Sequence, residues 1–286
     1  MVVNYKSSNK DQKKGLYLVS TPIGNLGDIT FRAVDILKKS DYILCEDTRT
    51  SSNLFKKYDI KSKLISNHKF NEKKNLSKTI NLLKSGSIIS LISDAGTPII
   101  ADPGAILVQE CISNDINIIP IPGPSSVVSA ISVSGFSEKF IFYGFFPEKT
   151  KDIKKDLEVL SKLNLTIVFF ISAKKFKKNS IYLEKYFSDR KILICKELTK
   201  MYEQHFRLNI SKINEFNTEL RGEITLVISQ KFQNESENKL NDQDKTKIKK
   251  LMKKLSIKDI VTEIKKNKDI AKKEIYNYCL QVKNEK

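Results

Sequence analysis

The sequence predicts an α/β protein of two domains followed by a small helical module, and three observations lead to this fold class. The chain has 286 residues, which suits about two domains of typical size and a tail. Short apolar runs rich in β-branched residues alternate with amphipathic stretches, which is typical of βαβ units around a buried parallel sheet. A content of 40% hydrophobic residues with only 10 Gly and 7 Pro allows a packed core and excludes wholesale disorder and fibrous repeats.

Residues 15–134 are expected to form the first α/β domain, after a flexible basic segment at residues 1–14. Helices are expected at residues 31–39 and 76–84, which are amphipathic. The expected strands are the apolar runs at residues 16–20, 41–45, 63–66, 87–93 and 116–121.

Residues 135–232 are expected to form the second α/β domain, with the seam near residues 134–139. Helix-like stretches at residues 151–163 and 177–187 separate its apolar runs. The expected strands lie at residues 141–145, 165–172, 191–195 and 223–229.

Residues 233–286 are expected to form a linker and a helical tail. The stretch at residues 233–245 is polar, as a linker or an exposed loop is. Beyond it the spacing of apolar residues predicts two or three short helices rather than another α/β module. These apolar residues are Ile248, Leu251, Leu255, Ile260, Ile264, Ile270, Ile275 and Tyr278.

Several classes of protein are disfavoured by what the sequence lacks. No apolar run approaches the roughly 20 residues that cross a bilayer, and the polar N-terminus lacks the apolar core of a signal peptide, so we expect a soluble cytoplasmic protein with no membrane partner. The four cysteines are far apart, contain no CxxC pair and have only two His to help, so we expect reduced thiols and no metal site. No GxGxxG or GxxxxGK[ST] motif is present, which disfavours a standard dinucleotide-binding or P-loop enzyme.

Polar, glycine-containing loops follow the predicted strands of the first domain. In an open parallel sheet, ligands bind outside the carboxyl ends of the strands, and small residues let the backbone approach a ligand closely. Ordinary turn formation is the alternative for any single loop. The loops are STPIGNLGD at residues 20–28, EDTR at 46–49, His68 with Asn71 and Glu72, DAGTP at 94–98 with DPG at 102–104, and PGPSS at 122–126.

The motifs LVSTPIGNLGDIT, CEDTRT, ISDAGTP with ADPG, PIPGPSS and KELTK occur in this order over roughly residues 16–230. Together they resemble the small-subunit ribosomal RNA methyltransferase I branch of the tetrapyrrole methylase superfamily. The resemblance continues more weakly in LSIKDIVTEI and KKEIY of the tail. The chain lacks the GxGPGD and GDP loops of tetrapyrrole methylases proper, and the segment at residues 170–178 (FISAKKFKK) departs from the branch by lacking an acidic residue and a Pro.

The resemblance implies two α/β domains with S-adenosylmethionine in the cleft between them, and a homodimer. It also implies methylation of the ribose 2′-hydroxyl of a cytidine in the decoding region of 16S rRNA. Asp94 is the expected partner of a ribose hydroxyl or of the amino group of the donor. The expected donor-binding residues are Pro22, Ser93, Asp94, Ala95, Gly96, Thr97, Ser125, Ser126, Leu198 and Glu223.

Transfer of a methyl group from a sulfonium to a ribose hydroxyl requires in-line positioning and is helped by a base or by a cation near the developing alkoxide. Our candidates for the base are Glu46, Asp47, His68 and Glu72, and Arg49 and Lys174 or Lys175 are the candidates for an electrostatic or phosphate-holding group. Asp47 is the first choice for proton handling, because it matches an acidic family position at the end of the second strand. The alternative for Asp47 is a helix cap or an ion pair with Arg49. His68 is a candidate for contacting the cytidine, with a structural role as the alternative.

An RNA partner is also indicated by charge, because 51 Lys and Arg against 33 Asp and Glu give a net charge of +18. The excess is concentrated in residues 1–14, 149–191 and 234–286, although a compositional bias toward Lys would have the same appearance. The expected RNA-binding residues are Arg49, Asn71, Glu72, Lys174, Lys175, Lys177 and Lys178.

Two other functions stay open at this point. One is a methylase of a tetrapyrrole or another small molecule on the same fold, because a fold does not determine a substrate. The other is a catalytically silent RNA-binding factor in ribosome assembly, in which the basic surfaces carry the whole function.

Overall fold

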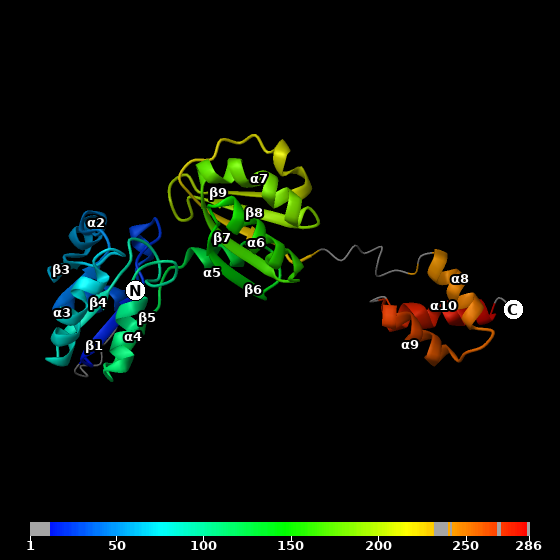
Figure 1. The fold of residues 1–286 in the computed structure, drawn as a ribbon, viewed down its shortest axis with the longest axis horizontal. Coiled ribbons are helices and arrows are strands. Elements are labelled where there is room, and N and C mark those ends of the chain that lie inside the picture. Colours follow the sequence, from blue (N-terminus) through cyan, green and yellow to red (C-terminus); the bar gives the residue numbers. More distant parts are fainter. Residues whose placement is uncertain (1–11, 232–239, 241, 268–269, 285–286) are drawn as a thin grey trace, which may run out of the picture. The chain divides into compact units, whose positions relative to one another are not determined.

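The computed structural model describes residues 12–231, 240, 242–267 and 270–284. The chain divides into two compact units, Met1–Gln230 and Lys231–Lys286, which are described separately (Figure 1). The first unit contains two sheets with alternating helices and the second contains helices, so the predicted fold class is confirmed. Most of the predicted basic N-terminal segment and of the predicted linker lies outside the described residues.

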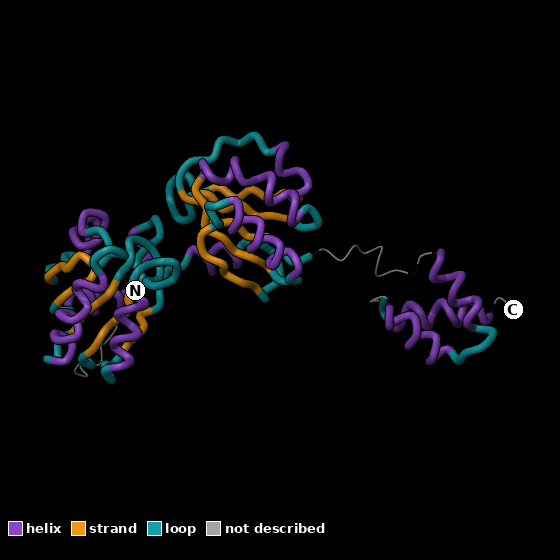
Figure 2. Tube along the Cα trace, viewed as in Figure 1, coloured by secondary structure: helices purple, strands orange, loops and turns teal. Residues whose placement is uncertain are grey.

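The first sheet has the strand order β3-β2-β4-β1-β5, and all its neighbouring strands are parallel. Helices flank both of its faces (Figure 2). The strands are β1 (Gly15–Val19), β2 (Tyr42–Cys45), β3 (Lys63–Ser66), β4 (Ile88–Leu91) and β5 (Ile118–Ile121), and the helices are η1 (Leu26–Asp28), α1 (Phe31–Lys39), α2 (Thr48–Tyr58), α3 (Glu72–Lys84), α4 (Ala105–Ser113) and α5 (Ser126–Ser132).

Each face of this sheet has its own apolar core. Successive strand residues point to opposite faces, so Ile43 packs with α1 and α2 while Leu44 packs with α3 and α4. The helix α1 has the predicted limits, and it begins at Phe31 because the Thr30 hydroxyl caps it by accepting the backbone N–H of Ala33 at 3.1 Å. Burial on both faces explains why the strands are continuous apolar runs in the sequence.

The second sheet is mixed, with the order β6-β7-β10-β8-β9. Only β6 and β7 are parallel, and the other neighbouring pairs are antiparallel. The elements are β6 (Phe140–Phe145), α6 (Thr150–Lys162), β7 (Thr166–Ser172), α7 (Ala173–Phe187), β8 (Lys191–Lys196), β9 (Gln204–Asn209), η2 (Ile210–Glu215) and β10 (Glu223–Ile228).

The strand β9 was not expected from the sequence. Its residues, QHFRLN, are all at least partly exposed, and the strand lies at the edge of the sheet beside β8. An edge strand exposed to solvent needs no apolar run, so the sequence carried little signal for it.

The two faces of the second sheet have different partners. One face packs against α6, α7 and η2. The other face, which includes Leu193 and Val227, packs against Ile23, Val127 and Ala130 of the first α/β domain. The apolar face of α5 therefore completes the core of the second sheet and brings the strand-end loops of the first sheet close to it.

The second unit contains three helices in its described residues, α8 (Asp242–Leu251), α9 (Ile257–Asn267) and α10 (Lys272–Asn284). Their apolar residues, among them Ile248, Ile260, Ile264, Ile275 and Cys279, form a core of their own. This agrees with the predicted short helices. Among the described helices of the whole chain, none combines the length and apolar character needed to span a bilayer.

Candidate active site

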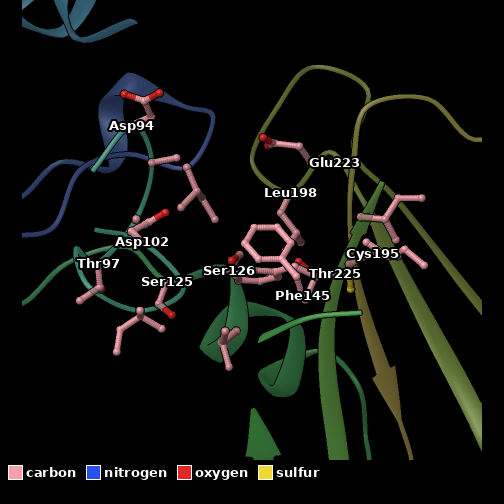
Figure 3. Close-up of a pocket in the computed structure, with 18 of the residues that line it drawn as sticks. Asp94, Thr97, Asp102, Ser125, Ser126, Phe145, Cys195, Leu198, Glu223 and Thr225 are labelled. Atoms are coloured by element: carbon pink, nitrogen blue, oxygen red, sulfur yellow. The ribbon is translucent and has the colours of Figure 1, made fainter. Parts of the chain in front are cut away.

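A cavity of about 390 Å³ lies where loops of the first sheet face the second sheet (Figure 3). One side consists of the loops that follow β1, β2, β4 and β5, and the other of residues from β6, β7, β8 and β10. Of the residues predicted from the sequence, those that line it are Glu46, Asp94, Ala95, Gly96, Thr97, Ser125, Ser126, Leu198 and Glu223.

Two predicted donor residues, Pro22 and Ser93, are buried beside the lining without being part of it. Their loops are joined to each other: the backbone N–H of Thr21 donates to the carbonyl of Gly96 at 2.9 Å, and that of Gly96 donates back at 3.0 Å. Gly96 has a φ of 79°, a left-handed conformation that glycine adopts without steric cost. The paired backbones join the DAGTP loop, which lines the cavity, to the loop that follows β1.

Several lining residues were given no site role from the sequence, among them Asp102, Phe145, Cys195, Lys200 and Thr225. Asp102 lies in the ADPG segment that follows the DAGTP loop, so its position after the fourth strand was an available signal. Cys195 and Thr225 lie within apolar strands that are antiparallel neighbours, and only the packing of the two domains makes them part of a cavity.

The rim formed by the second sheet carries a charged network. The ammonium of Lys200 lies 3.0 Å from Glu197 Oε1 and 3.1 Å from Glu223 Oε2, and the backbone N–H of Glu223 donates to Glu197 Oε1 at 3.1 Å. Burial disfavours the ammonium, but the hydrogen bonds to the two carboxylates outweigh it and raise the pKa of Lys200. The network fixes the loop that brings Leu198 to the cavity.

Three carboxyl groups line the opposite side, and each has a raised pKa. Burial is the main cause for Glu46 and Asp94, followed for Glu46 by the charge of Asp94. Burial and then the charge of Glu46 raise the pKa of Asp102 to about 6, although a hydrogen bond with Ser93 acts in the opposite direction. Carboxylates that are partly desolvated and repel one another favour a cationic ligand, because a positive charge relieves both costs.

Asp47 is not among the cavity-lining residues and is occupied elsewhere. Its Oδ1 accepts the backbone N–H of Arg49 at 2.8 Å, which caps α2, and its Oδ2 accepts from the Arg49 guanidinium at 2.7 Å. These contacts lower the pKa of Asp47 to about 2. The geometry is the capping and ion-pair alternative considered for this residue, and a carboxylate of such low pKa is a weak base.

Three further predicted residues lie between β3 and the first turn of α3, namely His68, Asn71 and Glu72. His68 is partly buried, and its Nδ1 accepts the backbone N–H of Phe70 at 3.3 Å. Asn71 stabilises the loop from within, because its Oδ1 accepts the backbone N–H of His68 and its Nδ2 donates to the carbonyl of Ser66.

The RNA contact expected for Glu72 is corrected by its burial. Only 6% of the residue is exposed, and its Oε1 accepts the backbone N–H of Leu107 in the first turn of α4 at 3.2 Å. The carboxylate therefore joins α3 to α4 and has no surface to offer an RNA.

The predicted basic residues of the segment that departs from the family pattern lie on α7 and are exposed. They are not cavity-lining residues, and one of them, Lys175, forms an ion pair with Glu148. Lys174 and Lys177 border a separate hollow beside η2. These cations therefore belong to the outer surface of the second α/β domain.

The chain is similar to a family of methylases and to relatives that are named as rRNA methyltransferases. Residues 15–214 match the family model described as Tetrapyrrole (Corrin/Porphyrin) Methylases. A ribosomal RNA small subunit methyltransferase I of Rickettsia prowazekii is 41% identical over 93% of this chain and 96% of its own. A protein of the same name from Thermotoga maritima is 43% identical over 76% of this chain and 98% of its own.

Solved structures with lower identity share the fold. A uroporphyrin-III C-methyltransferase of Thermus thermophilus, complexed with S-adenosyl homocysteine, covers 75% of this chain and 97% of its own with a TM-score of 0.55 at 15% identity. A diphthine synthase covers 79% of this chain and 91% of its own with a TM-score of 0.57 at 13% identity.

Proposed function

The chain belongs to the small-subunit ribosomal RNA methyltransferase I branch of the tetrapyrrole methylase family, and we propose that it methylates a ribose 2′-hydroxyl of a cytidine in the decoding region of 16S rRNA. S-adenosylmethionine is the methyl donor of this family. The observation that carries the rRNA substrate is the identity of about 41% to a named rRNA methyltransferase over nearly the whole of both chains.

The residues of the cavity fit the donor. Apolar side chains, among them Ile23, Val127 and Leu198, suit an adenine ring, and the carboxylates of Glu46, Asp94 and Asp102 suit a sulfonium and an ammonium. When bound, the donor supplies an electrophilic methyl group. We assign to the chain the tasks of excluding water from this group and of holding the acceptor hydroxyl in line with it.

Proton transfer from the acceptor hydroxyl is assigned to Glu46 or Asp102 rather than to Asp47. Both line the cavity, and a raised pKa makes each a better base than a carboxylate whose pKa is about 2. Above about pH 6 Asp102 is ionised and able to accept a proton. Asp47 then has the separate task of positioning Arg49, whose side chain is 90% exposed, toward an approaching phosphate.

Recruitment of the RNA is assigned to the basic surfaces. Exposed lysines on α7, such as Lys174, Lys177 and Lys178, supply charge on the second α/β domain, and the helical module adds further lysines on α8. Phosphate contacts of this kind supply affinity without sequence preference, so sequence recognition requires other residues.

The decisive experiment incubates the protein with methyl-labelled S-adenosylmethionine and small ribosomal subunits from cells that lack the activity. We expect label in 16S rRNA that is recovered as a 2′-O-methylated cytidine after nuclease digestion. Label on a base, or none on rRNA, would overturn the proposal. In a parallel incubation with a tetrapyrrole in place of the subunits, label on the tetrapyrrole would support the small-molecule methylase. RNA binding without transfer would support the silent assembly factor.

We also propose that the protein works in the cytoplasm as a homodimer, as the family resemblance implies. Sedimentation equilibrium of the purified full chain gives the mass in solution, and a monomer would contradict the second part of this proposal.

A further inference from the structure

Phe70 is the most exposed large apolar residue in the described part of the chain. It lies between β3 and α3 and is 94% exposed. An aromatic ring left almost wholly in water gains nothing for folding from hydrophobic burial. The ring is therefore available to a ligand or a partner.

The loop that carries Phe70 is held by side chains. The backbone N–H of Phe70 donates to His68 Nδ1, and the His68 and Phe70 rings lie edge to face with their centroids 6.1 Å apart. Amide nitrogens of both Asn71 and Asn75 donate to the carbonyl of Ser66, at 3.1 and 2.8 Å. A loop fixed in this way presents the ring at low entropic cost.

The loop lies beside the candidate active site. Cys45 and Ser66 are paired at the ends of β2 and β3, and the backbone N–H of Asn67 donates to the carbonyl of Cys45 at 2.8 Å. The residue that follows β2 is Glu46, which lines the cavity. Adjacent strands are only about 5 Å apart, so the His68 loop borders the acidic side of the cavity.

The surroundings of the ring are positive. Lys69, Lys73 and Lys74 are exposed, and within the described residues no ion pair engages them. The neighbouring carboxylate, Glu72, is buried against α4. An exposed aromatic ring among free lysines is the arrangement that binds single-stranded nucleic acid, in which the base stacks on the ring and the phosphates meet the cations.

We propose that residues 67–74 form an RNA platform at the acceptor side of the cavity, where a base of the single-stranded rRNA segment that is methylated stacks on Phe70. The inference rests on the proposed function and names a residue that positions its substrate. Stacking on one side of the target ribose limits the rotation of the nucleotide, so it brings the 2′-hydroxyl to the cavity in a restricted set of orientations.

The chain contains no Trp, so Phe70→Trp introduces a single tryptophan, at the platform, whose fluorescence can be excited apart from that of the 10 Tyr. Titration with a decoding-region RNA oligonucleotide should quench its fluorescence, while S-adenosylmethionine alone should not. The matched control is Ile112→Trp, because Ile112 is 63% exposed near the end of α4, the helix that leads to β5 at the sheet edge opposite β3. The fluorescence of this variant should stay constant. If the Phe70→Trp variant methylates small subunits and its fluorescence is not quenched by the RNA, the inference is overturned.

The kinetic counterpart uses Phe70→Ala. We expect kcat/KM for small subunits to fall about 5- to 100-fold, the usual effect of losing one base stack. The Kd of the donor should be unchanged, and Phe70→Trp should restore the rate. If Phe70→Ala instead dissociates a dimer in sedimentation equilibrium, the ring belongs to an interface between copies and the platform is rejected. If the wild-type protein transfers no methyl group to rRNA, the proposed function is wrong. The quenching experiment measures RNA binding at Phe70→Trp directly, so it tests the platform independently of methyl transfer.

Discussion

The backbone N–H of Asn25 donates a 3.0 Å hydrogen bond to the side-chain hydroxyl of Thr199, so a loop of the first α/β domain is joined to a loop of the second at the rim of the cavity. The approach is close, because a Cβ on Gly24 would lie 2.5 Å from Lys200 Cγ and 2.9 Å from the carbonyl oxygen of Leu198. Thr199 also has a φ of 64°, which a β-branched residue adopts only under constraint. The loop is thus held in a strained conformation by the contacts it makes.

Thr199→Val should weaken donor binding. The substitution keeps the shape and removes the hydroxyl, which leaves the Asn25 N–H without this partner and loosens the loop that carries Leu198. We expect a loss of about 1 kcal/mol, or several-fold in the Kd of S-adenosylmethionine measured by calorimetry. Thr199→Ser retains the hydroxyl and is the matched control. An equal loss in both variants would contradict a role for the hydrogen bond.

Asp102 should make donor affinity depend on pH. Burial and the charge of Glu46 raise its pKa from 3.8 to about 6, and a cationic donor prefers the ionised carboxylate. The Kd of S-adenosylmethionine should therefore rise as the pH falls below about 6. In Asp102→Asn the affinity should be weaker at pH 8, and its pH dependence should be smaller. A variant with the wild-type pH profile would exclude this carboxyl as the titrating group.

Asp102 should also affect the stability of the protein without donor: its ionised form favours donor binding but lowers the free energy of unfolding. Because its pKa is higher in the folded than in the unfolded protein, its ionisation costs more in the folded state. Its contribution to the free energy of unfolding is therefore complete below about pH 4 and is lost as the pH rises to about 6. Thermal unfolding without donor should show Asp102→Asn gaining stability over the wild type at pH 8, and the gain should vanish near pH 4.

Substitutions of Glu46 and Asp47 should have different effects, because we expect the first to lower kcat and the second to lower stability. Glu46→Gln should lower kcat by about 100-fold or more if it accepts the proton, and it should also weaken donor binding because it removes one of the three carboxylates that face the cationic donor. Asp47→Asn retains a capping side chain and should leave most of kcat, whereas Asp47→Ala should lose about 1 kcal/mol of stability in urea unfolding. The sequence-based assignment of Asp47 as the proton acceptor requires the reverse ranking of kcat, so single-turnover rates of the three variants decide between them.

Arg190 should be essential for stability without touching the cavity. The residue is 1% exposed, and its guanidinium donates to the carbonyls of Ser161, Leu163, Leu165 and Ser229 at 2.6 to 3.2 Å. Arg190→Leu leaves these acceptors without the donor, and we expect a loss of about 3 kcal/mol or more in the free energy of unfolding. Arg221→Leu, at an exposed ion pair with Glu219, should cost less than about 1 kcal/mol. Similar losses in both variants would contradict this account.

The parts of the fold that depend on local sequence patterns, such as the limits of helices and strands, were predictable from the sequence. The limits of α1 and of β3 were predicted from periodicity and apolar character. The spacing of apolar residues in the tail predicted two or three short helices, and the described part of the tail has three. The strand β9 was missed because an exposed edge strand of polar residues resembles a loop in sequence. The burial and the contacts of individual side chains were predicted less well. Glu72 was expected at the surface, yet α4 covers it and its carboxylate accepts a backbone N–H in the first turn of that helix.

The sequence alone determined the class of this protein. Strand-end loops with the order and spacing of a methyltransferase family, and a charge of +18, follow from residue identities and from the way parallel strands place their ends at one edge. The tertiary structure decided which carboxylates can act in the cavity. Glu46 and Asp47 are adjacent in the chain, but one lines a partly desolvated cavity and the other caps α2 beside Arg49. Their opposite pKa shifts arise from burial and from the partners that the fold places beside each carboxylate, and residue type does not encode either.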